Sequence, residues 1–175
     1  MSLQFTTLDR LEHDRRSFDA GTGDGRETLT DYLRTKAAKH QDQHVCRVFV
    51  LTDDTAPKRI IGYYTLSNGE IAWDSLSEDE APKLPRHPLG VIVLGRLAVD
   101  HTEQRRGYGP QLLMDALWRT ARVSEHSSVY AMVTDPLNES AAGFYRKYGF
   151  MPLPGNPGRL YIPIATVLKS IPPTT

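Results

Sequence analysis

Apolar and polar residues follow regular spacings along most of the chain. These spacings predict strands in its first half and strands alternating with helices in its second half. Short runs rich in β-branched and aromatic residues predict strands at residues 3–8, 46–52 and 59–66. The polar residues 53–58 join the last two runs as a hairpin, and the charged residues 9–18 predict a short helix.

A longer helix is predicted after the glycine-rich residues 20–25. Apolar residues recur there at the spacing of one helical face, from Leu29 to His40. Thr28 is the predicted N-cap, because Asp31 follows three residues later as in a capping box.

Two segments in the middle of the chain are predicted to lie outside regular elements. Asn68 followed by Gly69 is a strong turn signal, and it predicts that the chain reverses into a strand at residues 70–73. The polar, proline-rich residues 75–88 predict a weakly constrained loop that could close over a substrate.

The second half alternates strands and helices. The predicted strands are 91–99, 129–133, 150–153 and 159–163, the predicted helices are 109–123 and 138–148, a turn falls at 155–158, and one or two helical turns fall at 164–171. Asn138 is the predicted cap of the second of these helices and Gly149 its end. The buried stripe of helix 109–123 is predicted to be Leu112, Leu113, Ala116, Leu117 and Ala121. Strands followed by two strand–helix units predict one mixed α/β sheet, in a single domain that spans residues 1–175.

Charge and cysteine content narrow the setting. The chain has 21 basic and 21 acidic residues, so any contact with nucleic acid would need a local basic patch. Cys46 is the single cysteine, which excludes an internal disulfide, and its predicted place is a strand, as a small buried hydrophobe. The six histidines have no metal-ligand spacing, so no metal is expected. The sequence has no apolar run long enough for a membrane span and no signal-peptide pattern, which predicts a cytoplasmic protein without a membrane partner.

A short basic loop lies between the strand 91–99 and the following helix. It reads Gln104, Arg105, Arg106, Gly107, Tyr108, Gly109, Pro110. The two glycines let the backbone approach an anion, Pro110 suits the first helical position, and the unpaired N–H groups of the first helical turn would point at a diphosphate. The spacing matches neither the dinucleotide fingerprint nor a Walker loop. A strand-to-helix turn without a ligand is the alternative interpretation.

The loop resembles the acetyl-CoA loop of the GCN5-related N-acetyltransferase (GNAT) family, whose pattern is Gln/Arg-x-x-Gly-x-Gly/Ala. A second family pattern, Asn-x-x-Ala-x-x-Phe-Tyr-x-x-x-Gly-Phe, is matched by Asn138, Ala141, Phe144, Tyr145, Gly149 and Phe150. The resemblance implies a mixed, mostly antiparallel central sheet flanked by helices, with acetyl-CoA as co-substrate. The residues that it implies for acetyl-CoA binding are Leu97, Ala98, Val99, Gln104, Arg105, Arg106, Gly107, Tyr108, Gly109, Pro110 and Asn138. Asn138 would touch the pantetheine arm and Tyr145 would lie next to the thioester sulfur, although a core role for Tyr145 is the alternative.

Two flanking segments resemble the acetyltransferase toxins of toxin–antitoxin pairs. They are residues 17–21, where Ala20 stands in place of the usual Cys, and the ending Arg159–Leu160–Tyr161–Ile162–Pro163. This resemblance implies acetylation of the α-amine of aminoacyl-tRNA, which would block translation. It also implies a ribbon–helix–helix antitoxin and a homodimer as partners.

Little catalytic help is needed for such a reaction. A free α-amine has a pKa of about 7.7–8.0, and esterification of the carboxyl lowers it, so no strong base is required. The Tyr145 hydroxyl would protonate the leaving thiolate, and N–H groups freed by a bulge near residues 97–99 would stabilise the oxyanion. Arg96 would orient a phosphate or pair with a carboxylate. Acetylation of a small amine or a protein N-terminus remains an alternative, as does a catalytically silent acyl-CoA-binding module.

Overall fold

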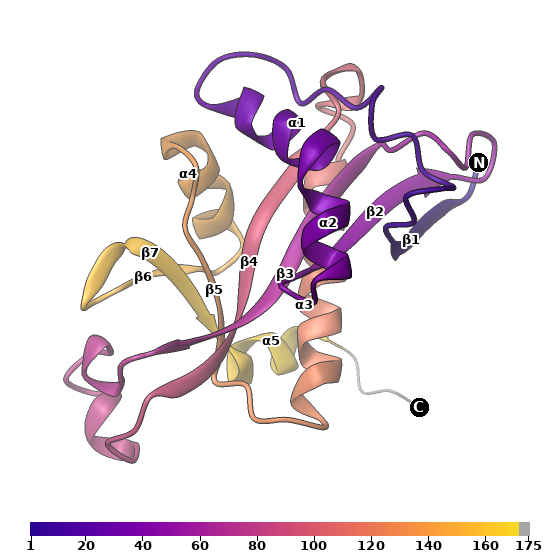
Figure 1. Cartoon of the computed structure of the whole chain (residues 1–175). Coiled ribbons are helices and arrows are strands. Elements are labelled where there is room, and N and C mark those ends of the chain that lie inside the picture. The colour runs from indigo at the N-terminus through magenta and orange to yellow at the C-terminus, as the bar shows by residue number, and fades with distance from the viewer. Residues whose placement is uncertain (172–175) are drawn as a thin grey trace. The chain divides into compact units, whose positions relative to one another are not determined.

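The computed structural model describes residues 1–171 (Figure 1). The strands are β1 (Leu3–Thr7), β2 (Arg47–Asp53), β3 (Gly62–Ile71), β4 (Leu89–Val99), β5 (Ala131–Thr134), β6 (Met151–Leu153) and β7 (Asn156–Pro163). The α-helices are α1 (Arg26–Thr35), α2 (Ala37–Asp42), α3 (Tyr108–Ser124), α4 (Glu139–Lys147) and α5 (Ile164–Ser170). Three short 3₁₀ turns are η1 (Trp73–Ser75), η2 (Ala81–Lys83) and η3 (His101–Glu103).

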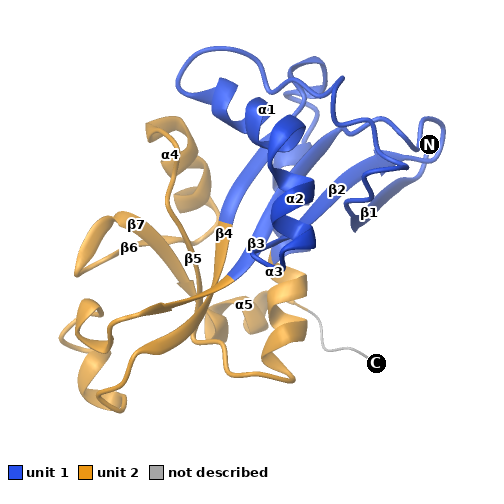
Figure 2. Cartoon of the chain, in the orientation of Figure 1, with its two compact units in different colours: residues 1–67, 95–116 blue, residues 68–94, 117–175 orange. Residues whose placement is uncertain are grey.

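The strands form one seven-stranded sheet in the order β1-β2-β3-β4-β5-β7-β6. β4 and β5 pair in parallel, while β1–β2, β2–β3, β5–β7 and β6–β7 pair antiparallel. The predicted α/β class with a mixed, mostly antiparallel sheet is therefore confirmed. The chain divides into two compact units, residues 1–67 with 95–116 and residues 68–94 with the chain from Leu117 on (Figure 2).

In the first unit, α1 and α2 pack on the antiparallel strands β1, β2 and β3. Their shared core is formed by Leu8, Phe18, Ala20, Tyr32, Leu33, Ala37, Ala38, Val48, Val50, Ile60, Tyr63 and Ala98. The single helix predicted up to His40 is two helices, interrupted at Lys36, where φ is −123°. The predicted cap at Thr28 is wrong: the N-cap is Gly25, and the Thr28 hydroxyl donates to its carbonyl.

Residues 9–18 form turns, so the helix predicted there is wrong. Asp9 Oδ1 accepts from the N–H of Leu11, and Asp14 Oδ1 accepts from the N–H groups of Arg16 and Ser17. Aspartates that bond the backbone two or three residues ahead compete with helix formation, and here they prevail.

β3 runs straight through Asn68 and Gly69, so the turn predicted there is also wrong. A Cβ at position 69 would lie 2.8 Å from Val93 Cγ2. The glycine leaves room for a side chain of β4 and does not turn the chain.

The second unit contains β5, β6 and β7, to which residues 91–94 of β4 add a parallel strand. α4 connects β5 to β6. Its N-cap is Asn138, whose Oδ1 accepts from Ala141 N at 2.8 Å, and the chain leaves the helix at Gly149 with φ +98°, as predicted. The predicted stripe of α3 and the C-terminal helix α5 are confirmed as well.

Residues 75–84 pack within this unit, so this part of the predicted loop is more constrained than expected, whereas residues 85–88 are exposed. Leu76 and Ala81 are buried. The Glu80 carboxylate accepts hydrogen bonds from the hydroxyls of Tyr130, at 2.7 Å, and Tyr161, at 2.6 Å. Charge-assisted bonds of this kind are stronger than neutral ones and fix the segment to β7 and to the residue before β5.

Cys46 lies just before β2 and is half-buried, with its thiol 3.3 Å from the Tyr32 hydroxyl. Among residues 1–171, no helix combines the length and the apolar character that a membrane crossing requires.

Candidate active site

The predicted donor-binding loop lies in the first unit, between η3 and α3. Gln104 is extended, whereas Arg105 and Gly107 have φ +64° and +83°. Left-handed backbone is uncommon for a residue with a side chain, and at Arg105 it marks a turn that its surroundings impose. Pro110 is the third residue of α3, two positions later than predicted, and still within the first turn. The loop therefore runs directly into the N–H groups that open a 17-residue helix, as an anion site requires.

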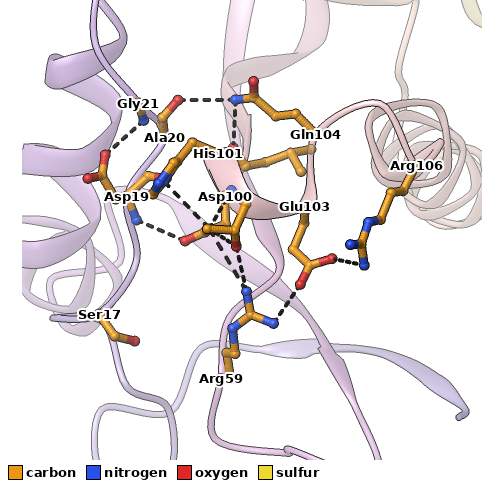
Figure 3. Close-up of polar contacts among 12 residues, drawn as sticks. Ser17, Asp19, Ala20, Gly21, Arg59, Asp100, His101, Glu103, Gln104 and Arg106 are labelled. Carbon is orange, nitrogen blue, oxygen red and sulfur yellow. Dashed lines mark hydrogen bonds and ion pairs between the residues drawn. The ribbon is translucent and has the colours of Figure 1, made fainter.

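The turn before the loop is built on a buried carboxylate. Asp100 is 5% exposed and accepts from Thr102 Oγ1 at 2.7 Å and from Thr102 N at 3.0 Å. It also accepts from Asp19 N at 3.0 Å (Figure 3). Burial acts to raise its pKa, but these hydrogen bonds outweigh burial and hold the pKa below its usual value. The Asp100 carboxylate is thus buried as an anion whose charge is stabilised by hydrogen bonds from the protein.

Glu103, on the same turn, joins two arginines. Its side chain pairs with Arg59 Nη1 at 2.6 Å and with Arg106 Nη1 at 3.0 Å, and the residue is 8% exposed (Figure 3). The predicted donor-binding residue Arg106 is therefore engaged with Glu103, while Arg105 beside it is exposed.

Gln104 is directed toward the backbone of its own unit. Its Nε2 donates to Ala20 O at 3.1 Å and to Val99 O at 3.4 Å. In this structure its amide joins the loop to residues 17–21. The Ala20 that replaces the family's Cys is buried, and its N–H bonds to Thr30 Oγ1, so this position is structural.

The predicted oxyanion donors lie at the end of β4, where Ala98 is buried and Leu97 and Val99 are partly buried. Two residues before Ala98, Arg96 N donates to the Thr65 hydroxyl at 3.1 Å. The Arg96 guanidinium lies over the Tyr32 ring at 3.6 Å, a stacking contact that sequence reasoning missed.

Tyr145 and Asn138 lie in the second unit. Tyr145 is on α4, is 6% exposed, and packs against the rings of Phe144 and Phe150. Burial raises the pKa of Tyr145 to about 12, against the opposing effect of a hydrogen bond with Thr134. The hydroxyl is therefore protonated at neutral pH and available as an acid.

The neighbours of Tyr145 on α4 are less buried. Tyr148 is half-buried and meets the Phe144 ring edge to face, whereas Arg146 and Lys147 are exposed, as expected of a solvated helix face. The turn between β5 and α4 is fastened to β7 by two hydrogen bonds of 2.9 Å from Arg159 to Asp135. Sequence reasoning did not identify this pair, whose members are 24 positions apart.

No group of three or more His, Cys, Asp or Glu residues suited to a metal ion occurs within residues 1–171.

Comparison with known proteins places these features in a family. Residues 44–152 match the family described as "Acetyltransferase (GNAT) domain". The chain is 34% identical over 138 residues to a "tRNA-acetylating toxin" of Mycobacterium tuberculosis. The matched region covers 79% of this chain and 81% of that protein. It is similar to a solved structure of AtaT complexed with acetyl-methionyl-tRNAfMet, with a TM-score of 0.88 and 27% identity over 97% of this chain and 99% of that one. It is also similar to the crystal structure of AtaTR bound with AcCoA, with a TM-score of 0.78 and 28% identity over 96% and 97% of the two chains. The chain belongs to the GNAT acetyltransferase family, and the prediction of an acetyl-CoA-dependent acetyltransferase is confirmed.

Proposed function

We propose that this protein transfers the acetyl group of acetyl-CoA to the α-amine of an aminoacyl-tRNA and so acts as a translation-blocking toxin. The observation that carries the proposal is the left-handed loop at Arg105 and Gly107, which opens directly into α3. A tRNA-acetylating relative and an AtaT structure with acetyl-methionyl-tRNAfMet support the choice of acceptor.

We assign donor binding to the loop, the end of β4 and one helix cap. The residues are Leu97, Ala98, Val99, Gln104, Arg105, Arg106, Gly107, Tyr108, Gly109, Pro110 and Asn138. Acetyl-CoA supplies the activated acetyl group. Backbone N–H groups at the start of α3, with Arg105 beside them, would hold its diphosphate.

Tyr145 is the proposed catalytic residue. The acceptor amine attacks the thioester carbonyl, and the backbone N–H groups of residues 97–99 would stabilise the resulting oxyanion. The C–S bond then breaks, the Tyr145 hydroxyl donates a proton to the departing thiolate, and the proton lost by the acetylated nitrogen returns through solvent to restore the Tyr145 hydroxyl. A pKa of about 12 keeps Tyr145 protonated at neutral pH, so that its hydroxyl can hydrogen-bond to the sulfur as negative charge develops there.

The proposal also covers the partners and the location of the protein. It includes a ribbon–helix–helix antitoxin, assembly as a homodimer, and a cytoplasmic location. An AtaT–AtaR complex bound to DNA is among the similar structures and supports the antitoxin.

One observation favours a second candidate, acetylation of a small amine or of a protein N-terminus. The chain has equal numbers of acidic and basic residues, 21 of each, so it has no net attraction for a polyanion such as tRNA.

Mass spectrometry of tRNA separates the two candidates. Total aminoacyl-tRNA is incubated with the protein and isotopically labelled acetyl-CoA, and the aminoacyl adenosines released by nuclease are analysed. The label is expected on the α-amine of one or a few amino acids. Label that stays absent from tRNA, while a peptide or small amine is acetylated under the same conditions, would overturn the proposed acceptor.

A further inference from the structure

The turn η3 places two acidic residues directly before a loop that is expected to bind an anion. Asp100 and Glu103 are both buried, and the second is followed at once by Gln104 and Arg105. A carboxylate near an anion-binding loop repels the anion. Neither carboxylate therefore helps donor binding through its charge, and another role must explain its place.

The partners of the two carboxylates indicate that role. Asp100 binds the backbone of Asp19, and its own N–H donates to Ile61 O at 2.8 Å. Glu103 binds Arg59, whose Nη2 also donates to Thr102 Oγ1 at 2.8 Å. The turn is thereby fastened on one side to Asp19 and on the other to residues 59–61, which directly precede β3; Figure 3 shows the contacts with Asp19 and Arg59.

The loop continues these attachments. Gln104 Nε2 donates to Ala20 O, and His101 N donates to Asp19 O at 2.7 Å. Beyond Gln104 the backbone adopts left-handed geometry at Arg105, which a non-glycine residue keeps only when the surrounding structure holds it. The attachments of the turn therefore flank this geometry on both sides, because Gln104 bonds Ala20 before Arg105 and Arg106 pairs with Glu103 after it.

We propose that Asp100 and Glu103 are positioning residues, which hold residues 104–107 in the left-handed turn that presents backbone N–H groups to the diphosphate of the acetyl donor. This inference rests on the donor site proposed above. Asp100 acts through the backbone before the loop, Glu103 also acts through the Arg106 side chain with which it pairs, and neither carboxylate touches the ligand in this proposal. Their negative charge opposes anion binding, and the geometry that they maintain outweighs it.

Whether a charge-removing substitution strengthens or weakens CoA binding tests the inference. If Asp100 and Glu103 affected the ligand through charge alone, Asp100→Asn and Glu103→Gln would tighten CoA binding. If they position the loop, each substitution weakens CoA binding, by about tenfold or more, because a small misplacement of aligned N–H groups is costly. Titration calorimetry with CoA measures the affinity directly and requires no acceptor.

A truncated donor separates positioning from general damage to the fold. S-acetylpantetheine lacks the diphosphate, so its kcat/KM with an acceptor that the wild-type protein acetylates should stay unchanged in both variants. The value for acetyl-CoA should fall. Asp53→Asn is the matched control, because Asp53 Oδ1 accepts from Thr55 N at 2.9 Å, the same i to i+2 turn bond that Asp100 makes. Circular dichroism establishes which variants fold, and Glu103→Gln carries the test if Asp100→Asn does not.

The outcomes are distinct. Weaker CoA binding with an unchanged S-acetylpantetheine rate supports the inference. CoA binding that is unchanged or tighter overturns it, and so does an equal loss with both donors. Failure of the wild-type protein to bind CoA would overturn the proposed donor site itself, and no variant is needed to see that result.

Discussion

At the scale of single residues, the proposed chemistry depends on one buried tyrosine, Tyr145. Its hydroxyl is bonded to Thr134, and a second tyrosine, Tyr148, lies three positions later and is half-buried. We expect Tyr145→Phe to lower kcat by about a hundredfold or more, the usual contribution of a positioned acid. CoA affinity should stay within about twofold of wild type, because the ring and its packing against Phe150 remain. Steady-state kinetics and calorimetry measure both quantities.

Tyr148→Phe is the control for that substitution and should leave kcat unchanged. The pH profile adds a second check. A Tyr145 pKa raised to about 12 means that the acid stays protonated as pH rises, so the rate should increase through the pKa of the acceptor amine and hold to roughly pH 10. A wild-type rate that falls above roughly pH 8, or a Tyr145→Phe variant that keeps full activity, would contradict the assignment.

At the scale of elements, the anchored segment around η1 and η2 is the main departure from expectation. Its attachment depends on Glu80, which joins the hydroxyls of Tyr130 and Tyr161. Burial and the neighbouring Glu80 raise the pKa of Tyr161 above its usual value, so its hydroxyl remains a donor. Glu80→Ala would leave the buried Tyr161 hydroxyl without its acceptor, and we expect the free energy of unfolding to fall by about 2 kcal/mol. Denaturant unfolding followed by circular dichroism measures the loss.

Glu78→Ala is the control, because Glu78 is an exposed glutamate of the same segment. Its substitution should change the free energy of unfolding by less than about 0.5 kcal/mol. Equal losses in the two variants would show that the segment is not held through Glu80.

Elements that rest on long, local periodicity could be predicted from the sequence, and those that depend on distant partners could not. Helix α3 could be predicted from the spacing of its apolar residues, and α4 from its cap residue Asn138 and the glycine at its end. Asn68 and Gly69 have the local chemistry of a turn, but Val93, some two dozen positions away, requires the glycine inside a strand. Propensity is a weak prior that such tertiary contacts override.

The candidate site divides in the same way. The donor loop could be predicted because its residues are contiguous. The bonds that hold it could not, since Asp19 and Asp100 are 81 positions apart and Arg59 and Glu103 are 44 apart. In the sequence, an Asp and a Glu beside a basic loop are indistinguishable from exposed charged residues, because their burial depends on partners that are distant in the chain.

At the scale of the whole molecule, donor binding should stabilise the folded chain, because a ligand that binds only the native state shifts the unfolding equilibrium. At a CoA concentration of one hundred times Kd the gain is about 2.7 kcal/mol. For a chain of this size we expect the thermal midpoint to rise by roughly 5 to 10 °C, measured by calorimetry or dye fluorescence.

A substitution in the loop should remove that rise. Gly107 has φ +83°, so Gly107→Val strains the backbone by about 1–2 kcal/mol and places a branched side chain where the diphosphate would approach. Its midpoint should be lower than that of wild type and should not respond to CoA. Gly158→Val is the matched control, because position 158 lies in β7, has no left-handed backbone, and an added Cβ there would meet no atom closer than 3.8 Å. A CoA-dependent rise that survives in Gly107→Val would move the donor site away from this loop, whereas its loss in both valine variants would mean that the effect is not specific to the loop.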